Sequence, residues 1–553
     1  MAPITRTCSV LALALLGAGA ASASSRVELA NSSTAATFVG ARAAELNGDP
    51  RRAAILYASL AAANPSDRTV ADRAIGQAIS AGDTALALRL ISARRNADLA
   101  VDAQLLLAAD RLAEGKTRDA LHALRQGGRI GDLAFLVPFV EAWNERRVDR
   151  SLQLLAQVPA GSAAYAYLPE HRALLLLRAR KMAEAEPFMN AALRAAGGRE
   201  ARLRIALADA YRRAGDSARA QAVLAGRDPA LEVARRRLDA GDRPGTGIHT
   251  AADAYSELLT ALAIDLSRAE VRSLPIAMVQ IARVAAPSNP AAPVLLGVLL
   301  GEAGRLDDAL VVLRSVEDDQ PFAAQARDAE VRVLTRAGKL QEALARAQAF
   351  ASSPRPTAGD WSRLGDVLDE LERYDQAAQA YGRALALLDG SAGPEAWQLH
   401  LLRGAMLERG DRWPEARASL LEAQRLAPRN PLVLNYLGYA QLERGEKLDE
   451  AEALIAQAHQ LAPDDASITD SLGWAQFKRG RVEEAIATLQ RAARSDPRET
   501  EIHEHLGDAL YTAGRKFEAR HAWRAALVTA EDDVKARLEA KIGSGLNPQN
   551  AAP

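Results

Sequence analysis

The chain has 553 residues, which is more than one ordinary hydrophobic core organises, so we expect several domains or a repeat array. Charged residues make up 25% of the chain and the formal net charge is -1, a balance that argues against nucleic-acid binding, since that needs a clustered basic excess. Aromatic residues make up only 4%, which argues against large aromatic cores.

The N-terminus has the pattern of an export signal. Arg6 supplies positive charge, residues 9–20 form an apolar run, and Ala21-Ser22-Ala23 has the small-x-small form of a cleavage site. The run is shorter than the roughly 20 residues that span a bilayer, although a retained short anchor is the alternative. The pattern predicts a signal peptide over residues 1–23, a periplasmic mature chain that begins near Ser24, and no transmembrane segment in it.

Chemistry that needs cysteine is excluded from this mature chain. Cys8 is the only cysteine, and it lies before the apolar run, where a lipid-attachment signal does not place it. The sequence also lacks GxxxxGK[ST], HExxH, GxSxG and SxxK. We therefore expect a protein that is not an enzyme and that has no cofactor.

One short histidine cluster resembles a metal site. His503 and His505 are two residues apart, so on a helix their side chains point about 200° apart and cannot share a metal. His505 and Asp508 could share one at i, i+3, but a hydrogen-bonded helix face is the ordinary interpretation. No metal is expected.

Residues 24–240 predict degenerate helical repeats, of which Ala208, Tyr211, Gly215 and Ala220 mark the clearest unit. A Gly- and Pro-rich stretch at 239–250 is the best domain boundary. We expect a more regular array over 250–542, followed by a disordered tail over 543–553, which has no apolar periodicity.

The clearest repeat lies near the C-terminal end. Gly404, Gly438, Gly473 and Gly507 are spaced 34, 35 and 34 residues apart. A glycine here would let the first helix of a unit approach its partner without a Cβ, and two alanines seven apart would allow close crossing on the second helix. Later glycines would end the first helix in the left-handed conformation, and proline would close the unit. The recurring residues are Ala416, Ala423, Pro428, Ala451, Ala458, Pro463, Gly480, Ala485, Ala492, Pro497, Gly514, Ala519 and Ala526.

This period and residue order resemble the tetratricopeptide (TPR) repeat. The resemblance implies an all-α protein, an α-solenoid of stacked TPR helix pairs forming a right-handed superhelix. A further unit from Trp361 to Ala384 matches well, and weaker matches upstream bring the expected total to roughly twelve helix pairs.

The first helices of TPR units line the concave surface, so the candidate binding residues lie there. With the marker glycine as the eighth residue of each unit, the fifth and ninth positions face that surface; they are Asn435, Tyr439, Asp470, Trp474, Glu504 and Asp508. Tyr439 and Trp474 occupy the same position in successive repeats, as expected of binding anchors. The alternative is that their rings fill space between repeats.

A narrower resemblance covers residues 434–527. The runs Leu434-Asn435-Tyr436-Leu437-Gly438-Tyr439 and Asp470-Ser471-Leu472-Gly473-Trp474, then His505-Leu506-Gly507 and Trp523, resemble the C-terminal repeats of long TPR proteins of the proteobacterial envelope. One type of member is an outer-membrane lipoprotein adaptor for a carboxyl-terminal processing protease. This chain departs from that type because it has no lipid-attachment motif.

The resemblance implies a scaffold or adaptor that binds other envelope proteins, among them a carboxyl-terminal processing protease and its substrates. Two other functions remain open. One is a TPR component of envelope polysaccharide export or outer-membrane assembly machinery, and the other is an enzyme without a known motif. Partner identity separates the first two, and a pocket of convergent titratable groups would favour the enzyme.

Overall fold

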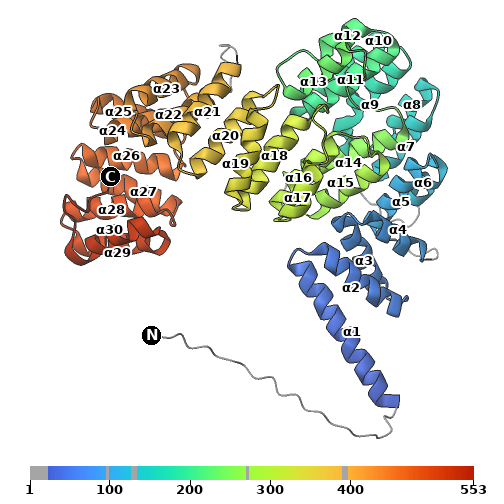
Figure 1. The fold of residues 1–553 in the computed structure, drawn as a ribbon, viewed down its shortest axis with the longest axis horizontal. Coiled ribbons are helices and arrows are strands. Elements are labelled where there is room, and N and C mark those ends of the chain that lie inside the picture. Colours follow the sequence, from blue (N-terminus) through green and yellow to red (C-terminus); the bar gives the residue numbers. More distant parts are fainter. Residues whose placement is uncertain (1–22, 95–98, 126–133, 269–272, 389–395, 553) are drawn as a thin grey trace. The chain divides into compact units, whose positions relative to one another are not determined.

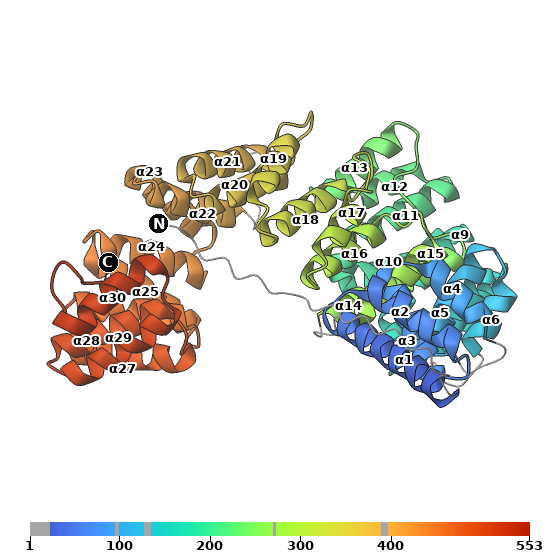
Figure 2. The ribbon, with the colours of Figure 1, turned by 60° about the horizontal axis from the view of Figure 1, so that its bottom comes forward.

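The structure is a computed structural model that describes residues 23–94, 99–125, 134–268, 273–388 and 396–552. The described chain is all α-helical, with thirty α-helices and short 3-10 turns, and no strand occurs in these ranges. It divides into two compact units, residues 1–326 and 327–553, and the division falls within α18. Within each unit most helices pair with their neighbours in the chain (Figures 1 and 2). The prediction of an all-α array of stacked helix pairs is confirmed.

The first unit holds the less regular repeats. Its helices are α1 (Ala23–Leu46), α2 (Pro50–Ala63), α3 (Arg68–Ala81), α4 (Thr84–Ser92), α5 (Val101–Ala113), α6 (Thr117–Arg125), α7 (Leu136–Asn144), α8 (Val148–Leu155), η2 (Ala163–Tyr167), α9 (Leu168–Arg178), α10 (Met182–Ala195), η3 (Gly197–Arg199), α11 (Glu200–Ala214), α12 (Ser217–Val223), α13 (Pro229–Asp239), α14 (Ala251–Ser267), α15 (Ser273–Ala285), α16 (Ala291–Glu302), α17 (Leu306–Leu313) and the start of α18 (Ala323–Arg336).

The second unit is a run of regular pairs that ends with a single helix. Its helices are α19 (Leu340–Ala351), α20 (Ala358–Glu370), α21 (Tyr374–Leu387), α22 (Ala396–Arg409), α23 (Trp413–Leu426), α24 (Pro431–Glu443), α25 (Leu448–Leu461), α26 (Ala466–Lys478), α27 (Val482–Ser495), α28 (Thr500–Thr512), α29 (Lys516–Thr529) and α30 (Asp532–Ser544).

The marker glycines pack as predicted in the second unit. A Cβ placed on Gly473 or Gly404 would collide with the leucine that lies sixteen positions later on the paired helix, Leu489 or Leu420. Gly507 faces the Trp523 ring in the same way. The repeated alanines of the second helices are also buried, so the prediction of close helix crossing is confirmed.

The turns inside the pairs use the left-handed conformation. Gly480 and Gly514 have φ of +77° and +81°, which confirms their predicted place after the first helix. Earlier pairs use Glu372 (φ +57°) and Asp411 (φ +56°) instead. These two positions carry no glycine, which is why the turn pattern is weaker there in the sequence.

In the first unit, α14 and α15 fold back onto much earlier helices. The pair contacts α3, α5 and α7 as well as its chain neighbour α16. The buried Tyr255 hydroxyl of α14 donates a hydrogen bond to the carbonyl of Leu105 at 3.0 Å, across 150 residues of sequence. This arrangement departs from simple stacking, in which each repeat contacts mainly its neighbours.

The Gly-rich stretch at 239–250 lies inside the first unit, whereas it was expected to separate two halves. A Cβ on Gly245 would collide with Ile205 of α11, and one on Gly247 would collide with Asp209 of the same helix. Arg202 of α11 also donates to the carbonyl of Thr246 at 2.8 Å. The glycines therefore permit close packing on α11 and do not mark a flexible linker.

The expectation of a disordered tail needs a correction for residues 545–552, which have defined contacts. The side chain of Asn550 donates to the carbonyl of Gly545 at 2.9 Å, and the N–H of Ala552 donates to Asp508 at 3.0 Å. Both Asn550 and Ala552 are buried. The segment is held by a turn and by a few individual contacts, which do not require a helical periodicity in its sequence.

Candidate protein-binding face of the C-terminal repeats

Three first helices, α24, α26 and α28, carry the six predicted site residues. Asn430 begins α24 by accepting hydrogen bonds from the N–H groups of Leu432 and Val433, and Asp465 begins α26 by accepting from Ile468. Successive first helices contact one another, α24 with α26 and α26 with α28. The six residues therefore share one face of the second unit, which we call the first-helix face.

Trp474 is part of the core of this region. Its side chain is 1% exposed, and its ring stacks on His505 of α28 with centroids 4.0 Å apart and on Phe477 at 4.9 Å. The indole N–H donates to Glu443 of α24 at 2.8 Å. Of the two alternatives for this residue, the ring that fills space between repeats is the one observed, so Trp474 is not an exposed anchor.

Tyr439 remains partly accessible. The side chain is half-buried, and its hydroxyl donates to Glu501 of α28 at 3.0 Å. Burial and the nearby Glu501 charge both raise the pKa of Tyr439, so the phenol stays protonated. Asn435, one turn earlier on α24, is also half-buried, and its buried side-chain oxygen accepts no hydrogen bond from the described residues. These two residues form the accessible part of the first-helix face.

Asp470 and His505 form a buried pair behind Trp474. The imidazole Nδ1 lies 2.8 Å from a carboxylate oxygen of Asp470, and both side chains are buried. Burial by itself lowers the pKa of His505, but the Asp470 carboxylate opposes it, and the pKa is raised overall. Predicted as a groove residue, Asp470 instead ties α26 to α28.

Glu504 and Asp508 hold the last helix in place. The ammonium of Lys541 on α30 is completely buried and lies 2.7 Å from Glu504 and 2.8 Å from Asp508. Arg537, also on α30, donates to both oxygens of Glu504 at 2.8 Å. Basic residues of α30 thus neutralise the negative charge of both carboxylates, and neither side chain is exposed.

The two carboxyl groups differ in acidity. Burial acts to raise the pKa of Glu504, but Arg537 and Lys541 outweigh it and the pKa is lowered. Burial raises the pKa of Asp508. It outweighs the opposing effects of Lys541 and of the Trp523 indole N–H, which donates a hydrogen bond to Asp508 at 2.9 Å.

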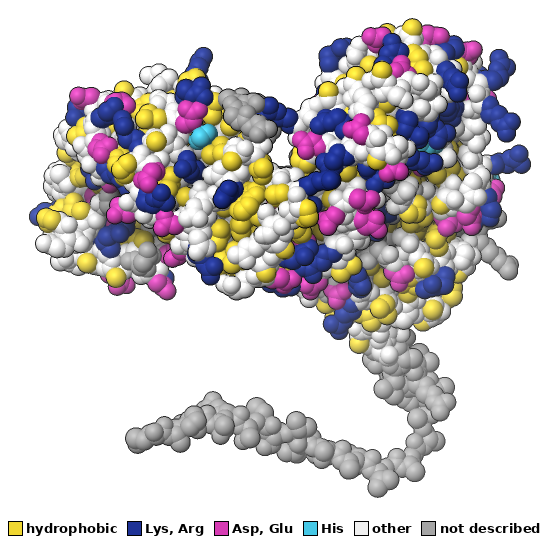
Figure 3. Space-filling model, turned by 45° about the horizontal axis from the view of Figure 1, so that its top comes forward, with side chains coloured by type: hydrophobic (Ala, Val, Ile, Leu, Met, Phe, Trp, Pro, Cys, Tyr) yellow, Lys and Arg dark blue, Asp and Glu magenta, His cyan; other side chains and the backbone are white. Residues whose placement is uncertain are grey.

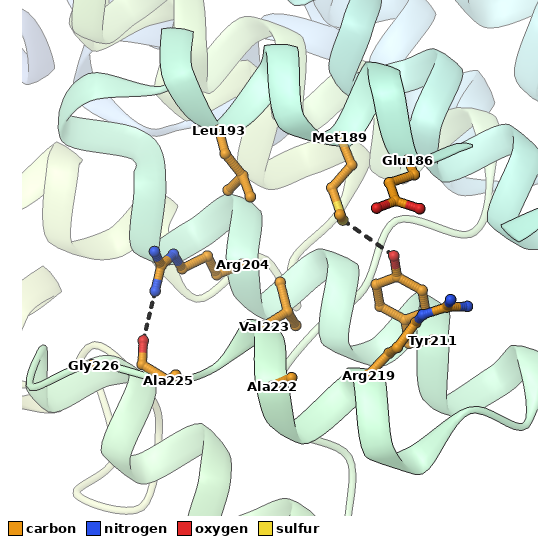
Figure 4. A pocket seen from close by; sticks show the side chains of 10 residues that line it. All are labelled: Glu186, Met189, Leu193, Arg204, Tyr211, Arg219, Ala222, Val223, Ala225 and Gly226. Carbon is orange, nitrogen blue, oxygen red and sulfur yellow. Dashed lines mark hydrogen bonds between the residues drawn. The ribbon is translucent and has the colours of Figure 1, made fainter. Parts of the chain in front are cut away.

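The first unit contains a separate cavity of about 510 Å³ between α10, α11 and α12 (Figure 4). Its wall combines apolar side chains with Glu186, Arg204 and Arg219. The Tyr211 hydroxyl points at the sulfur of Met189, 3.2 Å away, and Arg204 donates to the carbonyl of Ala225 at 2.6 Å. The sequence indicates Tyr211 only as a repeat position, because no motif joins the other lining residues.

The surface carries charges of both signs. Figure 3 shows basic and acidic side chains interspersed on the visible face, as the net charge of -1 suggests. Among the described residues, no group of three or more His, Cys, Asp or Glu side chains could hold a metal ion. No described helix is both long and apolar enough to cross a membrane. The predicted signal peptide lies outside the described residues except for Ala23, with which α1 begins.

A family comparison identifies the repeats of the second unit. The tetratricopeptide repeat model matches residues 362–431, 412–466 and 471–536. These ranges contain α20 to α29 in whole or in part, the pairs in which the marker glycines and alanines pack as described. The class that the fold defines is an all-α array of stacked helix pairs, and the chain is a TPR repeat protein.

The solved structures that this chain is similar to are remote in sequence and have TM-scores below 0.5. A tetratricopeptide repeat protein from Parabacteroides merdae is 16% identical, with 47% of this chain and 99% of that chain covered and a TM-score of 0.39. The Cut9–Hcn1 structure is also 16% identical, over 94% and 98%, with a TM-score of 0.39. PilF of Pseudomonas aeruginosa is 19% identical over 39% and 95%, with a TM-score of 0.33. In a comparison with curated proteins, nothing matches this chain.

Proposed function

We propose that this protein is a non-catalytic scaffold that binds partner proteins through the first-helix face of its second unit. The observation that carries the proposal is the accessible part of that face: the half-buried Tyr439 and, one turn earlier on α24, the half-buried Asn435. An amphipathic aromatic side chain that stays partly accessible is typical of protein interfaces. TPR arrays are also typically non-catalytic scaffolds.

We further propose that the scaffold acts in the periplasm as an adaptor that presents substrates to an envelope protease. The export pattern of residues 1–23 supports the location, and the resemblance of residues 434–527 to envelope adaptor repeats supports the role. N-terminal sequencing of the protein from a periplasmic fraction tests the location. A mature chain that begins near Ser24 is expected, and an intact Met1 in the cytosol would contradict it.

The binding test removes the Tyr439 ring. Truncation of an aromatic anchor costs about 2 kcal/mol, so Tyr439→Ala should weaken partner capture about thirtyfold. The experiment is a pull-down from envelope extract with mass spectrometry, and Leu432→Ala, an exposed side chain on the same helix, is the matched control. Unchanged capture by Tyr439→Ala with unchanged melting would remove this face as the binding site.

Trp474→Ala separates binding from stability in the same assay. Because the ring is buried, its truncation should cost about 3–5 kcal/mol of folding free energy and lower the melting temperature followed by circular dichroism. If the variant melts like the wild type but loses its partner, Trp474 is a binding residue and not a core residue. The identity of the captured proteins decides between a protease with its substrates and an export or assembly machine.

A further inference from the structure

The chain turns back on itself directly after α30. Gly545 has φ of +90°, and a Cβ there would collide with the Tyr511 hydroxyl of α28. The conformation and the close contact both require glycine at this position. The direction of the following residues is therefore determined where the helix ends.

A compact turn follows at residues 547–550. The N–H of Asn547 donates to the side-chain oxygen of Asn550 at 2.7 Å, and the N–H of Gln549 donates to the side-chain oxygen of Asn547 at 2.9 Å. Asn550 also donates back to the carbonyl of Gly545 at 2.9 Å. The turn satisfies its own polar groups, so it keeps its shape with little help from the helices.

Ala552 then lies on the first-helix face. Its N–H donates to Asp508 of α28 at 3.0 Å, and its methyl group belongs to the same buried apolar cluster as Trp474, Leu442 and Ile455. Asp508 and Trp474 are two of the residues that the repeat register predicts for partner binding. A segment of the chain itself thus occupies part of the face where a partner is expected.

The part of Ala552 that contacts this face is small, and many peptides could supply it. It consists of one methyl side chain and one backbone N–H, which any peptide with a small apolar residue offers. Pro548, Gln549 and Ala551 of the segment are exposed, and the contacts with the helices are made by its other residues. A peptide of the same chemistry has the contacts that it needs to take the place of Ala552.

We propose that Asp508 and the Trp474 cluster form a peptide-binding seat that residues 545–552 cover. Its partner is a protein segment in which an Asn-containing turn precedes a small apolar residue with a free backbone N–H. The partner binds by displacing the chain's own segment. This inference rests on the proposed scaffold function and adds both the recognised chemistry and a built-in competitor.

The test uses a fluorescent peptide with the sequence of residues 545–552, blocked at both ends, and the full chain. Ala552→Glu places a carboxylate against Asp508 and inside an apolar cluster, which should expel the segment. Ala551→Glu adds the same charge at the exposed neighbour and is the matched control. Fluorescence anisotropy should show that A552E binds the peptide at least tenfold more tightly than the wild type or A551E. A peptide that carries the A552E change itself should not bind.

Equal binding by all three proteins, or no binding by any, would overturn the proposal. A dimer that forms by exchange of the segment between two copies, without peptide binding, would assign the seat to a second copy and also overturn it. If A552E does not fold, hydrogen exchange of the wild type decides. Excess peptide should accelerate exchange at the Ala552 amide, and an unchanged rate would contradict displacement.

Failure here and failure of the scaffold function give different results. If peptide does not displace residues 545–552 but partner capture still depends on Tyr439, only the proposed peptide-binding seat is rejected. Peptide exchange at the seat without any captured protein would reject only the scaffold function.

Discussion

The regular pairs of the second unit and the folded-back pair of the first unit differ in how far apart in sequence their contacts lie. In α20 to α29 each marker glycine meets a side chain sixteen or seventeen positions later, such as Leu489 opposite Gly473. In the first unit, Tyr255 reaches Leu105 across 150 residues, and Arg305 donates to the carbonyl of Ser80 at 2.7 Å across 225. Short-range packing leaves a period in the sequence, whereas long-range packing does not.

The first unit also buries charged and polar groups between its helices. In the first unit the ion pair between Arg202 on α11 and Glu257 on α14 lies at 2.9 Å with both side chains almost fully buried. Burial raises the pKa of Glu257. Nearby, the indole N–H of Trp143 donates to His171 at 2.8 Å, and burial lowers the pKa of His171 to about 3, so this imidazole is neutral. The Arg202–Glu257 pair joins α11 to the folded-back α14, and we expect it to make the first unit unfold cooperatively.

The largest expected effect tests that coupling. Arg202→Met leaves Glu257 without its buried partner, which should cost about 3–5 kcal/mol of folding free energy. Because the pair joins α11 to the folded-back α14, hydrogen exchange should show lost protection throughout the first unit. Arg213→Met, at an exposed position on α11, is the control and should leave exchange unchanged. A loss confined to α11 and α14 would show that the first unit behaves like a simple array.

A smaller and more local effect is expected in the second unit. Ala485→Arg would overpack the crossing of α26 and α27 and bury a charge, at a cost of about 3 kcal/mol or more. Since repeats interact mainly with their neighbours, exchange protection should fall around the last repeats and persist in the first unit. Ala487→Arg, at an exposed position on the same helix, is the control. Uniform loss along the chain would contradict the difference between the regions.

The smallest expected effect is the pH dependence of the link between α26 and α28. The pKa of His505 is raised in the folded state, so its protonation stabilises the fold. This contribution is complete below the unfolded pKa of about 6.5 and is lost as the pH rises through the higher folded value. Denaturant unfolding of the wild type should therefore lose stability over that window, and His505→Gln should not show this loss. A variant with the same pH profile as the wild type would contradict the assignment.

The extent of sequence prediction differs among the site residues. The repeat register correctly placed all six site residues on the first helices of three pairs, α24, α26 and α28. Helical periodicity decides which face of a helix a residue occupies. It did not decide which of them stay accessible. Trp474 is covered by His505 of α28, and Asp508 by Lys541 and Ala552, which are contacts made by later elements.

By itself, the sequence determined the helical class, the repeat period and the close crossings of the second unit. Each of these depends on residues within about one repeat, where glycine and alanine leave a local trace. Only the tertiary structure decided that 239–250 packs onto α11, that α14 and α15 fold back, and that residues 545–552 cover part of the first-helix face. These depend on which distant surfaces fit together, and the shape of a distant partner surface leaves no periodic pattern in the residues that meet it.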